Sequence, residues 1–164
     1  MATGDPIGKY FPNNNSPPAT NFATFDQDGA SPVLDYDDAV NEAAIFFDIM
    51  DENYDGSTAF TITIGWKFTT FVGSQTCQWK ISIARIDDDN HDYGSLVFAA
   101  AVSALATEAS ADGELDYHTD TMTNAEADGI QPGELFAIKV ERDAALGTAS
   151  PGDAELAFVE IKLQ

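Results

Sequence analysis

The sequence is poor in basic residues and in cysteine. It has 164 residues, of which 7 are Lys or Arg and 28 are Asp or Glu, so the net charge is −21 at pH 7. Because contacts with phosphate groups require Lys and Arg side chains, this charge argues against binding to nucleic acid and to an anionic membrane surface. A single Cys excludes a framework of internal disulfide bonds.

Long apolar runs are also missing. No run approaches the length of about 18 apolar residues that a membrane-spanning helix needs. The first residues, MATGDP, lack the basic and apolar regions of a secretory signal peptide. We therefore expect a protein that is made without a signal peptide and is not held in a membrane.

Proline is concentrated at the start of the chain, where four of the seven prolines lie within residues 1–22. This composition favours extended and turn conformations and adds little apolar surface to a core. We therefore divide the chain into an extended N-terminal arm, residues 1–22, and a β-sandwich domain, residues 23–164. Such an arm is expected to dock on its own domain or on a neighbouring molecule.

Beyond the arm, apolar and polar residues alternate with a period of two, which is typical of half-buried strands. In Phe60–Phe68 every second residue is large and apolar, and Thr, Gly and Lys lie between them. The same pattern predicts further strands at Ala23–Asp26, Val33–Tyr36, Ala43–Ile49, Thr76–Ile86, Glu114–Met122, Glu134–Arg142 and Ala154–Leu163. About eight strands separated by Gly-containing turns predict an all-β fold, a jelly-roll-like antiparallel β-sandwich.

The alternation also predicts which side chains face the core. In the strand at 43–49 the predicted inward residues are Ile45, Phe47 and Ile49. In the last strand Ala157, Val159, Ile161 and Leu163 share one face, and Leu156 and Phe158 share the other. Between them, the Ala-rich stretch 96–109 is read as a short helical turn near Asp92–Phe98 followed by a strand that ends near Thr107.

The residues from Asp87 to Asp92 form a dense loop of oxygen ligands. Calcium binds six to eight oxygen atoms, so Asp87, Asp89 and Asp92 are its candidate ligands here. The EF-hand spacing fails, because its glycine position is occupied by Asp92 and its final glutamate position by Phe98. We expect a solvated acidic loop and no cofactor, and calcium binding at these residues is the alternative.

No catalytic residues are predicted. His91 and His118 are the only histidines, and the sequence has no nucleophile elbow, Walker loop or dinucleotide fingerprint. Close pairs of carboxylates are unavoidable among so many acids, so their presence gives little support to a hydrolase with paired carboxylates. Such a hydrolase is a further hypothesis, beside the two that are given at the end of this subsection. We expect a protein that is not an enzyme.

Tyrosines offer a route to glycan binding, because a tyrosine ring is flat and apolar with a polar tip. Tyr54 lies in a second acidic loop, residues 51–56, and Tyr93 follows the loop at 87–92. These two are the predicted glycan contacts, and Tyr36 and Tyr117 are further candidates. The two tryptophans, Trp66 and Trp79, alternate in phase with Ile and Phe, which predicts that they lie in the core.

About two-thirds of the chain resembles a family of small acidic structural proteins, decoration or tail-associated, of tailed phages. The resemblance lies in turn and strand motifs rather than in a site. The motifs are MDENYDG at 50–56, FTITIGW at 60–66, WKISIARIDD at 79–88, LDY at 115–117, PGELFAIKVERD at 132–143 and GDAEL at 152–156. It implies a jelly-roll-type sandwich found in virions, and it does not cover the arm.

Two hypotheses about function follow. The first is a structural virion protein, most simply a head decoration or cement subunit, made in the host cytoplasm and incorporated in the virion. It would form a homo-oligomer such as a trimer, and would bind the major capsid protein or another virion protein through sheet edges and through Tyr10, Phe11 and Pro12 of the arm. The alternative is a receptor- or glycan-binding β-sandwich module of a tail fibre or surface protein.

Overall fold

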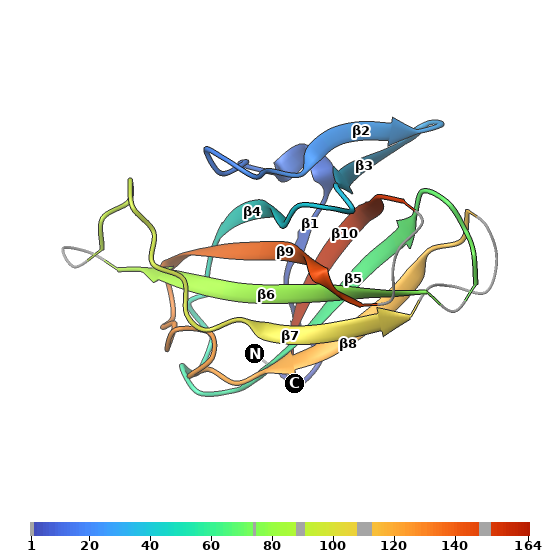
Figure 1. Ribbon diagram of the computed structural model, residues 1–164. Coiled ribbons are helices and arrows are strands. Elements are labelled where there is room, and N and C mark those ends of the chain that lie inside the picture. Colours follow the sequence, from blue (N-terminus) through green and yellow to red (C-terminus); the bar gives the residue numbers. More distant parts are fainter. Residues whose placement is uncertain (1, 74, 88–90, 108–112, 148–151) are drawn as a thin grey trace.

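The computed structural model describes residues 2–73, 75–87, 91–107, 113–147 and 152–164. Within these residues the regular structure consists of strands and one short 3₁₀ turn, η1 (Pro12–Asn14). None of the helical segments described is long and apolar enough to span a bilayer. The predicted all-β architecture is confirmed, since the strands form two antiparallel sheets packed as a jelly-roll-like sandwich (Figure 1).

The larger sheet, called sheet A, has six strands. Its order is β2-β3-β10-β5-β8, and β1 pairs with β10 further along the same strand. The bounds are β1 (Pro6–Tyr10), β2 (Thr24–Asp28), β3 (Ser31–Tyr36), β5 (Phe60–Phe68), β8 (Asp116–Met122) and β10 (Ala154–Leu163). The long strand β10 is therefore the axis of the sheet, with β5 on one side and both β1 and β3 on the other.

The smaller sheet, sheet B, has four strands in the order β4-β9-β6-β7. Their bounds are β4 (Glu42–Ile49), β6 (Thr76–Ile86), β7 (Val102–Thr107) and β9 (Leu135–Gly147). In Figure 1 the strands β9, β6 and β7 cross in front of β10 and β5, which shows the two layers of the sandwich. Alternation in the sequence predicts most of these strands because each one has a single large face to bury.

The core lies between the two sheets and is centred on aromatic rings. Trp66 of β5 and Trp79 of β6 are fully buried and meet edge to face with centroids 5.8 Å apart. Tyr36 packs on Trp79 in the same way at 5.1 Å, and its hydroxyl donates to the carbonyl of Val140. Each edge-to-face pair adds about 0.5–1.5 kcal/mol to the stability gained from burial. The prediction that both tryptophans are core residues is therefore confirmed.

The N-terminal segment is built into the sandwich. Strand β1 pairs with β10 of sheet A, and the chain then runs along the outer edge of β4 in sheet B. There the amide of Ser16 donates to the carbonyl of Ile45 at 2.7 Å, and the amide of Ala23 donates to that of Ala43 at 3.0 Å. Residues of the predicted arm thus dock on their own domain, where they join the two sheets and satisfy an edge that would otherwise be open to other chains.

Strand β4 has the opposite phase from the one predicted. Ala44 and Phe46 face the core and are buried, whereas Ile45 and Phe47 lie on the outer side and Ile49 is exposed. The error has a physical reason, because the outer side of this strand is itself partly covered and carries apolar residues too. Alternation cannot distinguish two apolar faces.

Strand β10 contains a bulge that shifts the alternation. Its pairing with β5 slips by one residue between Leu156 and Phe158. As a result Leu156 is buried together with Val159, although the strict period predicts opposite faces. In strand β8, His118 lies on the same side as the buried Met122. The predicted helical turn at 92–98 is only a hydrogen-bonded turn at 92–95, and the predicted strand that follows is β7.

Candidate aromatic binding face

Two aromatic rings stand together on the outer face of sheet A. Tyr117 of β8 and Phe158 of β10 both pair with Gly65 of β5, so they flank it from the two neighbouring strands. Their rings meet edge to face with centroids 5.3 Å apart, and the side chain of Tyr117 is exposed over 64% of its surface. Phe158 is partly buried. An aromatic pair of this kind on the outer face of a sheet is typical of a binding surface.

Gly65 allows this arrangement because it has no side chain. A Cβ atom at this position would lie 2.1 Å from Cε1 of Phe158, which is far inside the contact distance of two carbon atoms. The Phe158 ring therefore lies directly over the backbone of β5, and Gly65 is buried beneath it. A glycine inside a strand commonly marks a place where another group approaches the backbone closely.

A shallow hollow continues this surface toward β1. It has a volume of about 250 Å³ and is lined by Lys9, Phe11, Phe158 and Glu160. Phe11, which lies at one side of the hollow, is half exposed. Glu160 accepts from Lys162 at 2.6 Å and from Lys9 at 2.8 Å, and these two bonds hold the pKa of its carboxyl below the usual range. The hollow thus combines apolar walls with the carboxylate of Glu160 and the ammonium group of Lys9.

Threonines extend the polar part of the same face. The hydroxyls of Thr63 in β5 and Thr119 in β8 lie 3.0 Å apart, two residues along from Gly65 and Tyr117. Each hydroxyl has further capacity to donate or accept a hydrogen bond. Flat apolar rings beside such groups can hold a ligand that has one apolar surface and polar groups at its rim. We call Phe11, Gly65, Tyr117, Phe158 and Glu160 the aromatic face.

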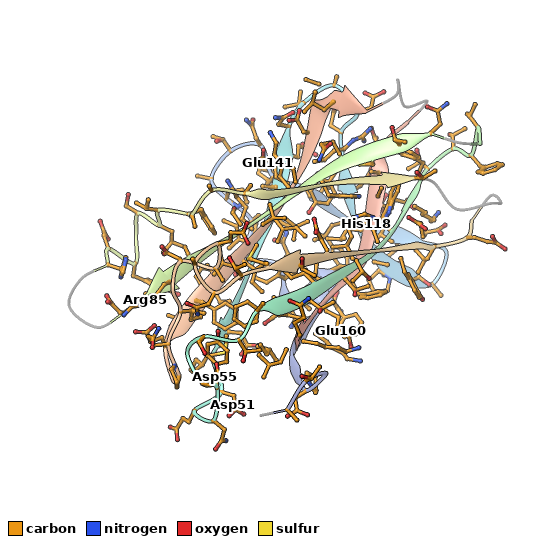
Figure 2. All side chains as sticks on the ribbon, turned by 90° about the horizontal axis from the view of Figure 1, so that it is seen from below. Asp51, Asp55, Arg85, His118, Glu141 and Glu160 are labelled. Atoms are coloured by element: carbon orange, nitrogen blue, oxygen red, sulfur yellow. The ribbon has the colours of Figure 1, made fainter. Side chains whose placement is uncertain are left out.

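The outer face of sheet B is different because the chain covers it. Figure 2 looks along the sandwich edge and labels Glu160 on one outer side and Glu141 on the other. On the second side the amide of Ala99 donates to the carbonyl of Ile83, and Lys139 lies 5.1 Å from the centre of the Phe98 ring. The outward-facing Ala84 and Ala137 are fully buried under this segment.

The predicted glycan contacts are divided between the core and the surface. Tyr54 is buried, its hydroxyl donates to the carbonyl of Thr58 at 2.7 Å and accepts from Asn124, so the prediction that it contacts a glycan is wrong. Tyr36 is likewise a core residue. Tyr93 is 65% exposed and lies on the sheet B side, with its ring centre 5.9 Å from that of Phe47.

Phe11 and Phe158 complete the aromatic face, but sequence reasoning did not select them as glycan contacts. The available signal was Phe158 itself, a large aromatic residue on the opposite side of β10 from Val159 and Ile161. Its partner Gly65 lies almost a hundred residues away, and only the register of β5 and β10 brings the two together.

The acidic loop at 87–92 uses its described carboxylates internally. Asp87 lies 3.1 Å from the guanidinium of Arg85 and 2.6 Å from Nδ1 of His91, and Asp92 accepts from the amide of Gly94. Asp89 lies outside the described residues. Among the residues that the structure does describe, no cluster of three or more Asp, Glu, His or Cys is arranged to hold a metal ion. Calcium binding by this loop stays a prediction.

The acidic residues of the second acidic loop, residues 51–56, also form hydrogen bonds close by in the chain. Asp55 accepts hydrogen bonds from the amides of Ser57 and Thr58, and the bonds from Thr58 and Ser57 hold the pKa of its carboxyl well below the usual range. Figure 2 places Asp51 and Asp55 together at one end of the molecule. These acids stabilise a turn, which is an ordinary task for Asp beside Gly.

Two of the three predicted arm anchors are used within the chain. Tyr10 is buried, its hydroxyl donates to Asp48 at 2.9 Å, and its ring centre lies 5.6 Å from that of Phe46. Burial raises the pKa of this tyrosine. Pro12 is buried as well, so these two residues hold β1 and η1 on their own sandwich, and Phe11 is the one that remains exposed.

No protein-family model matches the chain, and no curated protein matches it. Solved structures do resemble its fold. A family 35 carbohydrate-binding module from Clostridium thermocellum aligns with a TM-score of 0.53 and 12% identity, covering 96% of this chain and 97% of that one. A second module, from the Cellvibrio mixtus lichenase 5A and solved with cellotriose, aligns with a TM-score of 0.53 and 7% identity over 97% and 98% of the two chains.

A third similar structure is the exo-β-1,3-galactanase of Phanerochaete chrysosporium, with a TM-score of 0.55 and 8% identity. The match covers 98% of this chain but only 29% of the galactanase. At these identities the likeness defines the fold alone, and that fold is the jelly-roll β-sandwich that carbohydrate-binding modules share. The virion location, the capsid partner and the homo-oligomer stay predictions.

Proposed function

We propose that this chain is a non-enzymatic binding module that holds an oligosaccharide on the aromatic face. The observation that carries the proposal is the edge-to-face pair of the exposed Tyr117 and the partly buried Phe158, which Gly65 seats on the open side of sheet A. A pyranose ring has an apolar C–H face and a polar rim, so it matches a flat aromatic ring bordered by hydrogen-bonding groups.

The borders of the aromatic face supply those groups. Glu160 offers carboxylate oxygens, Lys9 offers ammonium protons, and the hydroxyls of Thr63 and Thr119 can do both. The hollow of about 250 Å³ beside Phe158 has room for part of a sugar unit, while the open sheet allows a chain of units to continue. Such an open surface suits binding to an oligosaccharide better than chemistry on it, because it does not exclude water.

The known modules with this fold support the proposal. Two of the similar structures are carbohydrate-binding modules by name, and one of them was solved with cellotriose. This fits the glycan-binding alternative better than the virion reading, for which neither the fold nor its similar structures offer a specific observation. We therefore place glycan binding first.

The test is a glycan array followed by calorimetric titration of the strongest ligand, with and without calcium, and with cellotriose included as a soluble probe. Tyr117→Ala and Phe158→Ala should each weaken binding by about tenfold or more, since truncating a central aromatic anchor costs about 1–2 kcal/mol. Tyr93→Ala is the matched control, because Tyr93 is equally exposed but lies on the opposite side of the sandwich.

Two outcomes would contradict the proposal. A silent array, in the presence of calcium and with a folded protein, would contradict glycan binding itself. Binding that is lost in Tyr93→Ala and kept in Tyr117→Ala would move the site to the outer side of sheet B and refute the aromatic face.

A further inference from the structure

A second exposed apolar surface lies at the other end of sheet A, between η1 and β2. It is a surface hollow of about 410 Å³ lined mainly by apolar atoms, and its walls include Pro12, Pro17, Phe22 and Phe25. The side chains of Phe22 and Phe25 are 46% and 49% exposed. We call this hollow the proline–phenylalanine groove. It is separate from the aromatic face, since the two share no lining residue.

One wall of the groove is an edge strand. Strand β2 pairs with β3 on one side, and within the described residues no strand pairs with its other side. All five of its residues are exposed. The amide of Gln27 donates to the side chain of Asp26 and so is not engaged by β3. In Figure 1 the β2–β3 hairpin projects from the top of the sandwich, where a further strand could approach it. Such an edge can accept an extended segment of another chain.

The charge around β2 favours a cationic segment. Asp26 and Asp28 are on the strand, and Asp35, Glu42, Asp153 and Glu155 follow nearby on β3, β4 and the start of β10. Burial, together with the neighbouring Asp153 and Glu155, raises the pKa of Asp35 to about 6. The nearby cations, Lys67 and Arg142, are already committed: Lys67 pairs with Asp28 and Glu155, and Arg142 donates to the carbonyl of Tyr36.

A second copy of this chain fits poorly. Antiparallel pairing of two β2 strands about Asp26 would set Asp26 opposite Asp26 and Thr24 opposite Asp28. Like charges directly opposite on neighbouring strands are destabilising, and each copy carries a net charge of −21.

We propose that the free edge of β2 and the proline–phenylalanine groove together bind an extended segment of a partner protein that carries Lys or Arg beside an apolar side chain. The segment adds as a strand to β2, its apolar side chain enters the groove between Phe22 and Phe25, and its cation pairs with Asp26. Backbone bonds to the edge give affinity, and the groove and the carboxylates give specificity.

The experiment is selection from a random peptide library against the full chain, followed by NMR mapping of the strongest selected peptide. Selected peptides should alternate apolar residues with Lys or Arg, and amide shifts should concentrate at residues 22–28. Gln27→Pro, which removes an edge donor that β3 does not use, and Phe25→Ser should each weaken binding by about tenfold or more.

The controls separate a specific site from attraction to an acidic protein. Asp26→Lys and Glu52→Lys change the net charge equally, but Glu52 is exposed in a loop outside the groove. Binding must fall in Asp26→Lys and persist in Glu52→Lys. An equal fall in both, selection of neutral peptides, or a self-association in sedimentation that Gln27→Pro abolishes would each overturn the proposal. An unchanged far-ultraviolet circular dichroism spectrum shows that each variant is folded. Phe25→Ser tests the site independently of the Pro substitution.

Discussion

The two outer faces of the sandwich are built from similar strands but are used differently. On sheet A, the exposed Tyr117 and the partly buried Phe158 flank Gly65, whereas on sheet B the outward Ala84 and Ala137 are buried under the chain's own residues. The sequence supplies small residues where the chain covers a face and large aromatic residues where it does not. The aromatic pair and the hollow beside it therefore lie on the face that the chain leaves open.

The ion pairs of the two faces support the same contrast. On sheet B, Lys80 of β6 bonds to Asp143 of β9, and Lys139 lies 3.6 Å from Glu141 on the same strand, so these charges pair with each other within the sheet. On sheet A, Glu160 lies between two lysines at the border of a hollow. Exposed ion pairs contribute only about 0–1 kcal/mol each, so these groups matter more for what they can bind than for stability.

The largest expected effect comes from Gly65→Ala. The new Cβ would lie 2.1 Å from the Phe158 ring, so the ring must move out from the sheet. We expect a loss of about 1–3 kcal/mol in the free energy of unfolding, toward the lower end because a partly buried ring on the outer face can rotate away. Chemical denaturation measures it, and the glycan affinity should fall in the same variant.

Gly94→Ala is the matched control for that substitution. Gly94 lies in the segment on the sheet B side, its φ is not in the left-handed region, and the nearest atom to a new Cβ is Oδ1 of Asp92 at 3.4 Å. It should leave stability within about 0.5 kcal/mol of the original and leave glycan binding unchanged. Equal losses in the two variants would contradict the special role given to Gly65.

The next effect is a pH dependence of opposite sign on the two faces. Burial and nearby carboxylates raise the pKa of Asp35, on β3 of sheet A, to about 6. The folded state thus holds this proton more tightly than the unfolded chain does, so the carboxyl costs stability as the pH rises from about 4 to about 6, and that cost persists above. Asp35→Asn should therefore stabilise the protein at about pH 8 by about 1–2 kcal/mol after solvent screening.

Asp143, on β9 of sheet B, behaves in the opposite way. The hydrogen bond from Lys80 lowers the pKa of this carboxyl, so it stabilises the fold above the unfolded pKa and loses that contribution as the pH falls below about 4. Asp143→Asn should destabilise the protein at about pH 8, and its difference from the original chain should shrink progressively as the pH falls below about 4. Denaturation curves at several pH values and constant ionic strength measure both variants, and two shifts of the same sign would refute this difference between the faces.

The sequence predicts the central strands well and the surface poorly. Strands β5, β6 and β9 have one clearly apolar side, so alternation alone finds them and places Trp66 and Trp79 inside. The phase of β4 was wrong because both its sides carry apolar residues. The strict period also fails in β10, where one bulged residue exchanges the two faces.

The candidate site depends on contacts that alternation does not report. Phe158 becomes part of a binding surface only because β5 brings Gly65 beneath it and β8 brings Tyr117 beside it. Tyr54 was predicted to be exposed because acids surround it in the sequence, but its loop turns back and its hydroxyl is satisfied inside. Residue type indicates which side chains can bind a sugar, and only the register between strands shows which of them are free to do so.

The smallest effect tests whether covering a face and binding on a face are separable. Phe98→Ala removes the ring that lies over the outer side of sheet B and contacts Lys139. We expect a loss of about 1 kcal/mol in the free energy of unfolding, because the half-buried ring loses part of its burial and a cation–π contact. The glycan affinity should stay unchanged, since the aromatic face is on the other side of the sandwich.

Tyr117→Ala should give the converse result. Its ring is mostly exposed, so its removal should change the free energy of unfolding by less than about 0.5–1 kcal/mol while the glycan affinity falls. Denaturation and calorimetry on the two variants together show whether stability and glycan affinity change independently. If Phe98→Ala weakened glycan binding as much as Tyr117→Ala does, the two faces would be coupled through the core. The segment that covers sheet B would then have to be counted as part of the site.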